Sequence, residues 1–156
     1  MSGLDPLVGR HEIATAAQMT ALGARMGGML RAGDLVVLTG ALGAGKTTLT
    51  RGIGAALGVR GTVQSPTFVI ARTHPSLGAG PALLHVDAYR LGSAAELDDL
   101  DLDLDHAVTV VEWGRDYVAG LRERWWEVEI ERPSAGPEDE LEASDPRTVT
   151  ITRHPG

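Results

Sequence analysis

The feature that most constrains this chain is the segment 40–47, which reads Gly-Ala-Leu-Gly-Ala-Gly-Lys-Thr and matches the pattern G-x-x-x-x-G-K-[ST] at every fixed position. The apolar run 35–39 precedes it with the composition of a buried strand, and 47–57 has the apolar spacing of a helix that ends at Gly58. A glycine-rich loop between a strand and a helix N-terminus points its backbone N–H groups at an anion. The pattern therefore predicts a P-loop that binds the phosphates of a nucleoside triphosphate, and a glycine-rich turn that binds nothing is the weaker alternative.

The residues of the predicted P-loop have distinct expected roles. Lys46 is expected to contact the β- and γ-phosphates, Thr47 to bind Mg²⁺ and Thr48 to donate to the α-phosphate. Lys46 is also the only lysine among fourteen basic residues, so this position favours a compact charge on a flexible stem over a planar guanidinium. Lys46 is thus a candidate catalytic residue as well as a phosphate contact. The backbone around the phosphates is expected to come from Gly40, Leu42, Gly43, Ala44 and Gly45.

Two carboxylates follow apolar runs that read as buried strands. Asp87 comes after the run 82–86 and Glu112 after the run 108–111, and ligands gather at the carboxyl ends of strands in open α/β sheets. Asp87 is therefore the predicted metal ligand beside Thr47. Glu112 is predicted to orient or deprotonate the attacking water and to contact the metal or its water shell. The alternative is that either carboxylate only ends its strand.

Several further residues are candidates for the same site. Ser65-Pro66-Thr67 is a polar turn that either senses the γ-phosphate through a hydroxyl or is an ordinary turn. Trp113, directly after Glu112, is a candidate contact for the nucleotide or for a partner, with a core position as the alternative. His85 and His106 are expected to be structural or solvent-facing, because no Cys or second His stands at metal-ligand spacing.

One pattern points to a different ion. Asp101, Asp103, Asp105 and Glu112 have the spacing of an EF-hand calcium loop, but His106 stands where the sharp turn of that loop needs glycine. The segment is therefore expected to be an acidic loop that faces solvent or a partner.

The composition limits the class of protein. At 156 residues, 43% hydrophobic, the chain is expected to form one domain over 1–156. No apolar run approaches the roughly 20 residues of a membrane helix, and no secretory signal or cysteine is seen, so a cytoplasmic protein without membrane contact is expected. The net charge of −7 argues against direct binding of nucleic acid, so RNA is expected to be reached through a partner.

The order of elements predicts an α/β fold, namely a three-layer P-loop domain with a mainly parallel sheet. Helices are predicted at 13–31 and 93–100, and a strand at 68–71. From Trp125 onward, alternating apolar and polar residues predict an antiparallel pair of strands added at the C-terminal end. The intervening segment 133–145, rich in Pro, Ser, Gly and acidic residues, is expected to be a mobile loop.

Four separated motifs, in order and at similar spacing, resemble the TsaE (YjeE-type) family of bacterial ATPases over about residues 12 to 130. The motifs are the P-loop at 42–48, Ser65-Pro66-Thr67, His85-Val86-Asp87-Ala88-Tyr89-Arg90 and Val111-Glu112-Trp113.

The resemblance implies an ATPase that uses ATP and Mg²⁺ and acts with the proteins TsaB and TsaD in making threonylcarbamoyladenosine in tRNA. TsaD would perform the transfer, while ATP hydrolysis on this chain would reset the complex, and tRNA would be contacted only indirectly. The resemblance supports Lys46 at the phosphates, Thr47 and Asp87 at magnesium, and Glu112 as the catalytic carboxylate. It also implies that Thr67 is a switch residue.

Two positions and one loop depart from the family pattern. Members often have Asp where this chain has Ala41 and Pro where it has Gly114, and the loop 133–145 is longer than usual. The loss of the acid at position 41 leaves in question any contact made by that side chain, whereas backbone binding of phosphate is expected to survive.

GTP is disfavoured as the nucleotide because the chain has no asparagine and therefore no N-K-x-D loop.

Two other functions compete with this interpretation. A P-loop kinase of a small molecule would need an arginine-rich lid, and Arg122 and Arg124 are the nearest match. A nucleotide-binding regulator without significant hydrolysis would leave Glu112 with a structural role.

Overall fold

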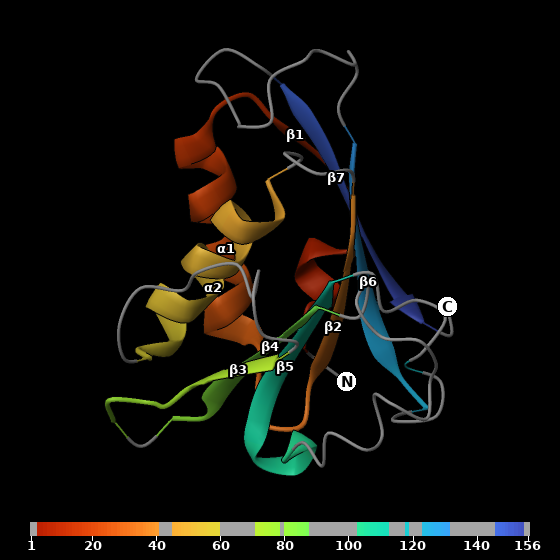
Figure 1. Ribbon diagram of the computed structural model, residues 1–156. Helices are drawn as coiled ribbons and strands as arrows, with labels where there is room; N and C mark the ends of the chain where they lie inside the picture. Colours follow the sequence, from red (N-terminus) through yellow and green to blue (C-terminus); the bar gives the residue numbers. More distant parts are fainter. Residues whose placement is uncertain are drawn as a thin grey trace.

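The computed structural model describes residues 3–40, 45–59, 71–78, 80–87, 103–112, 118, 123–131 and 146–154 (Figure 1). In chain order the elements are η1 (Asp5–Leu7), β1 (Gly9–Ile13), α1 (Ala16–Met29), β2 (Leu35–Thr39), α2 (Lys46–Leu57), β3 (Ala71–His74), β4 (Ala82–Asp87), η3 (Leu104–His106), β5 (Ala107–Glu112), β6 (Trp125–Glu131) and β7 (Arg147–His154). The strands of these segments form one sheet in the order β1-β7-β6-β2-β5-β4-β3.

The centre of the sheet is parallel. Strand β2 pairs in parallel with β5 on one side and with β6 on the other, and β5 pairs in parallel with β4. All six residues of β5 are buried, as are the first four of β2, which explains why both strands are continuous apolar runs rather than alternating ones. The predicted α/β fold with a mainly parallel central sheet is confirmed.

The flanks of the sheet are antiparallel. Strand β7 pairs with β6 and with β1, and both β6 and β7 alternate between buried and more exposed residues, as expected for a sheet with one wet face. The predicted antiparallel pair from Trp125 onward is therefore confirmed. On the other flank β3 and β4 form an antiparallel pair. The predicted strand 68–71 overlaps β3 only at Ala71, and 68–70 lie outside the described residues.

Helix α1 begins later than the predicted 13–31. Ile13 is the last residue of β1, and the helix starts at Ala16 behind the N-cap Thr15. The Thr15 side chain accepts a hydrogen bond from the Gln18 backbone N–H at 3.1 Å, while Gln18 Oε1 accepts from the Ala14 N–H at 2.6 Å. This exchange closely resembles a capping box, and it fixes the start of the helix.

The two α-helices touch through their backbones. A Cβ atom placed on Gly23 of α1 would lie 2.2 Å from the Leu49 carbonyl oxygen of α2, and one on Gly52 of α2 would lie 2.2 Å from the Thr20 carbonyl oxygen. Gly27 is similarly enclosed, 2.6 Å from the Ile53 carbonyl oxygen. Gly23, Gly27 and Gly52 therefore form the helix contact.

Both helices lie on the same face of the sheet (Figure 1). The core lies between the helices and the sheet. Its members are apolar side chains of the helices and of every strand of the sheet except β3, together with Leu4, Leu7, Leu30 and Val59. The helix predicted at 93–100, the turn 65–67 and the loop 133–145 lie outside the described residues. No helix within the described ranges is long and apolar enough to cross a membrane.

The helix contact predicts that replacement by alanine has different effects on stability at two glycines of α1. We expect Gly23→Ala to lower the free energy of unfolding by about 1–3 kcal/mol, because the added methyl group meets a backbone oxygen that cannot move aside. Gly28→Ala is the matched control. A Cβ atom there meets nothing within 4 Å. Because alanine has the higher helix propensity, Gly28→Ala should leave the free energy of unfolding unchanged or raise it by up to about 1 kcal/mol. Urea unfolding measures both, and equal stability of the two variants would contradict the close backbone contact.

Candidate functional site

The candidate site lies at the carboxyl edge of the central strands, where β2 leads toward α2. Gly40 follows β2, and Gly45 is the N-cap of α2. The Gly45 backbone has φ 113° and ψ 15°, in the left-handed region that side chains disfavour, so glycine suits this position of the motif. Because the N-cap is glycine, no N-cap side chain occupies the first N–H groups of the helix. They are placed to bind an anion.

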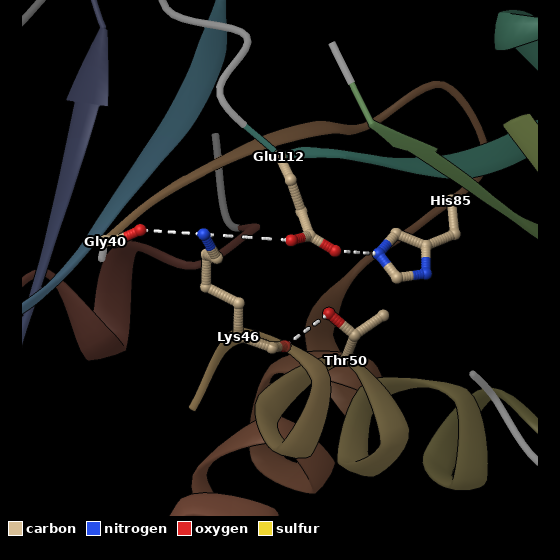
Figure 2. A network of polar contacts seen from close by, with 5 residues as sticks. All are labelled: Gly40, Lys46, Thr50, His85 and Glu112. Atoms are coloured by element: carbon tan, nitrogen blue, oxygen red, sulfur yellow. Dashed lines mark hydrogen bonds and ion pairs between the residues drawn. The ribbon is translucent and has the colours of Figure 1, made fainter. Parts of the chain in front are cut away.

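Lys46 opens α2 and turns its side chain back over the end of β2 (Figure 2). The ammonium Nζ donates a hydrogen bond to the Gly40 carbonyl oxygen at 2.7 Å and lies 3.9 Å from Oε1 of Glu112. Only 7% of the residue is exposed. Burial, partly offset by the charges of Glu112 and Asp87, lowers the pKa of Lys46 below its usual value. The lysine is thus a buried cation, and one of its contacts is a carbonyl oxygen that a phosphate oxygen can replace.

Glu112 is the last residue of β5 and is buried. Its Oε2 accepts a hydrogen bond from Nε2 of His85 at 2.5 Å, so the carboxylate lies between His85 and Lys46 (Figure 2). Sequence reasoning expected His85 to be structural or solvent-facing, and a solvent-facing position is wrong because the residue is 0% exposed. The available signal was its spacing. Residues two apart in a strand share a face, and His85 stands two before Asp87.

Asp87 ends β4 directly beside Glu112. The two residues are partners in the parallel register of β4 and β5, on strands spaced about 4.8 Å apart. Asp87 is half-buried, and its charge reaches Lys46, because it raises the pKa of that lysine against the effect of burial. The structure therefore brings together three of the residues singled out in the sequence, one cation and two carboxylates.

The remaining P-loop candidates divide into two groups. Thr47 and Thr48 are half-buried in the first turn of α2, next to Lys46. The Thr50 hydroxyl donates to the Lys46 carbonyl oxygen at 2.8 Å and ties that turn to the next one. The predicted nucleotide contacts that lie outside the described residues are Leu42, Gly43, Ala44, Thr67 and Trp113.

The acidic loop before β5 does not share a site with Glu112. Asp103 accepts a hydrogen bond from Nδ1 of His106 at 2.8 Å, and both side chains are exposed, as expected for His106. Strand β5 separates this loop from Glu112 by about 16 Å, from the rise per residue. In the described ranges, no group of three or more His, Cys, Asp or Glu could hold a metal ion. The calcium-loop pattern therefore does not form a site with Glu112.

The site fits a magnesium-bound phosphate better than a metal held by protein alone. Mg²⁺ commonly takes one or two carboxylates, a hydroxyl and phosphate oxygens. Thr47, Asp87 and Glu112 supply that donor set at the edge where the helix N-terminus and Lys46 favour anions. A carboxylate fixed beside a phosphate site can also accept a proton from water.

Comparisons with known proteins agree on one family. The family model described as threonylcarbamoyl adenosine biosynthesis protein TsaE matches residues 13–140. A tRNA threonylcarbamoyladenosine biosynthesis protein TsaE from Streptomyces coelicolor is 58% identical over 137 residues, which cover 86% of this chain and 89% of that protein. One from Bacillus subtilis is 37% identical over 125 residues, which cover 77% and 70%. The crystal structure of YdiB from the same species superposes with a TM-score of 0.67 at 27% identity, covering 91% of this chain and 82% of that one.

The buried ammonium predicts a pH-dependent cost to stability. Since burial lowers the pKa of Lys46 in the folded protein, the cost of holding the charge is fully present at neutral pH. It begins to fall once the pH exceeds the lowered pKa, where the folded protein releases the proton, and it is gone above the ordinary lysine pKa, where the unfolded chain releases the proton as well. We therefore expect Lys46→Met to be more stable than the parent protein at pH 7 without ligand, with a gap that narrows toward pH 10.5. Urea unfolding at both pH values measures the gap, and Arg51→Met on the same helix is the control. A gap that widens with pH would contradict the assignment.

Proposed function

This chain belongs to the TsaE family, and on that basis we propose that it is a Mg²⁺-dependent ATPase that supports threonylcarbamoyladenosine modification of tRNA. A part in tRNA threonylcarbamoyladenosine biosynthesis follows from the family. The observation that supports the ATPase activity is the buried cluster at the carboxyl edge of the sheet, in which Lys46 faces Glu112 at 3.9 Å beside Asp87.

Phosphate binding would use the first turn of α2. Lys46 would exchange its hydrogen bond with the Gly40 carbonyl for one with a β- or γ-phosphate oxygen, and a charge-assisted bond to an anion is stronger than one to a carbonyl. The N–H groups that follow Gly45 would add their own hydrogen bonds, with Thr48 donating to the α-phosphate. Leu42, Gly43 and Ala44 would complete the loop, with Thr67 and Trp113 as further contacts.

The metal would be held by three residues that reach the same edge from different elements. Thr47 would come from α2, Asp87 from β4 and Glu112 from β5, the last directly or through a water molecule. Bound Mg²⁺ supplies positive charge that stabilises the phosphate oxygens during phosphoryl transfer.

Glu112 is the candidate general base. Its Oε2 is bound by His85 and its Oε1 faces Lys46. Once Lys46 engages the phosphates, Oε1 is placed to orient a water molecule and to accept its proton.

The proposed partners are TsaB and TsaD, as the resemblance to the TsaE family implies, and the charge of the chain supports an indirect contact with tRNA. With a net charge of −7, the protein is poorly suited to bind tRNA directly, so the tRNA is reached through TsaB and TsaD. Hydrolysis would be weak on the chain alone and would reset the complex between rounds of modification in the cytoplasm, while TsaD performs the transfer. The whole chain, 1–156, would act as a single P-loop domain.

Phosphate release from ATP tests this function directly. We expect release by the full chain to be stimulated by TsaB, TsaD and tRNA together and to be abolished by Lys46→Ala. The same variant should lose ATP affinity about 10- to 100-fold in calorimetry, the range expected from loss of one charged hydrogen bond, whereas Arg51→Ala should not. Stimulation by a single added metabolite in place of the partners would favour a small-molecule kinase. Undiminished ATP binding by Lys46→Ala would remove the site.

The role of Glu112 has a separate test. We expect Glu112→Gln to bind ATP as the parent protein does but to turn it over about 10²- to 10⁴-fold more slowly, because the amide cannot accept the proton of water. Glu123→Gln, an exposed position ahead of β6, is the matched control and should keep full turnover. Equal rates for Glu112→Gln and the parent would move the base elsewhere. Negligible release from both, with partners present, would favour a regulator without hydrolysis.

A further inference from the structure

We propose that His85 is a positioning residue, which holds the Glu112 carboxylate in the orientation that water activation requires. The inference rests on the proposed function. Its first observation is the contact itself, because Nε2 of His85 lies 2.5 Å from Oε2 of Glu112 and both residues are buried. A carboxylate is an acceptor, so the Nε2 nitrogen carries the shared hydrogen.

The two oxygens of Glu112 have different partners. Oε2 is engaged by a short hydrogen bond, whereas Oε1 lies 3.9 Å from the Lys46 ammonium, beyond hydrogen-bond distance. His85 therefore fixes the plane of the carboxylate and leaves Oε1 as the oxygen directed toward Lys46 (Figure 2). Oε1 is thus the oxygen that receives the proton from water.

Nucleotide binding increases the importance of this contact. Lys46 must turn toward phosphate oxygens to bind them, and that movement weakens its attraction for Glu112. A glutamate side chain has three rotatable bonds, and without a fixed partner it samples several rotamers. His85 belongs to β4, outside the P-loop and α2, so it can hold the carboxylate while the lysine moves.

The position is costly for a polar ring. His85 is 0% exposed within a strand whose neighbours Leu84 and Val86 are buried and apolar, and its Nδ1 has no hydrogen-bond partner among the described residues. A buried polar group left without a partner lowers the stability of the fold. A leucine would fill this position of the strand without that cost, so stability alone does not explain the histidine. The hydrogen bond to Glu112 explains why a histidine stands at this position.

The test separates turnover from binding. In the complex with TsaB, TsaD and tRNA, we expect His85→Leu to lower single-turnover ATP hydrolysis about 10- to 100-fold, the effect typical of residues that orient a reacting group. The ATP dissociation constant should not change. His85→Gln, whose amide N–H can donate from nearly the same place, should recover part of the rate. His11→Leu is the matched control. His11 also makes a hydrogen bond through Nε2, a part-buried one to the Leu7 carbonyl oxygen at 2.7 Å, but it lies on β1.

A double-mutant cycle distinguishes positioning from structure. If His85 acts through Glu112, His85→Leu should cause no further loss in a Glu112→Gln background. An equal loss in that background, or weaker ATP binding together with a lower melting temperature, would assign His85 a structural role and overturn the proposal. If the parent protein shows Lys46-dependent phosphate release and His85→Leu releases phosphate at the same rate, only this inference is removed. A parent that releases no phosphate with its partners removes the proposed function as well.

Nitrogen-15 NMR of histidine-labelled protein provides a readout that does not need a folded His85 variant. The Nε2-bound proton of His85 should exchange slowly with water in the parent protein, both empty and with ATP bound, and rapidly in Glu112→Ala. Slow exchange that survives Glu112→Ala would show that the proton has another partner and would overturn the contact as the source of the positioning.

Discussion

The parallel pairing of β2 with β5, and of β5 with β4, is the constraint on which the site depends. In parallel strands the carboxyl ends meet at one edge, and the register places Glu112 level with Leu38 on one side and with Asp87 on the other. A slip of one residue would turn Glu112 to the opposite face of the sheet, away from Lys46. The chemistry of the site therefore rests on backbone hydrogen bonds between strands that are far apart in the sequence, and the burial of β2 and β5 on both faces secures them.

The parts of the site that could be predicted are those with a local signal. The P-loop pattern, the apolar runs of β2 and β5 and the carboxylates at strand ends each follow from a few consecutive residues, and the structure places Lys46, Asp87 and Glu112 together. The partner of His85 could not be predicted in this way. Which strand lies beside β4 is decided by the packing of the whole sheet, so the spacing from Asp87 could indicate a shared face but not the acceptor on β5.

Local signals can also be misread when two principles compete. Gly23 and Gly27 lower helix propensity, and in the sequence they count against the helix, but packing against α2 reverses their meaning because only glycine permits that distance. The start of the same helix had a signal in Thr15 and Gln18, three residues apart. The predicted helix began too early because Ile13 is apolar and fits the helical spacing. It belongs instead to the end of β1, where a buried residue is equally apolar.

The backbone contact between α1 and α2 also has a mechanical consequence. Side chains at an ordinary helix crossing can change rotamer and absorb a small shift, but carbonyl oxygens that lie against glycine Cα atoms have no such freedom. The two helices therefore behave as one stiff body, and Gly45, the N-cap of α2, lies at its end beside the candidate site. A tilt of α2 would therefore move α1 with it, because the two backbones cannot slide past each other at these glycines.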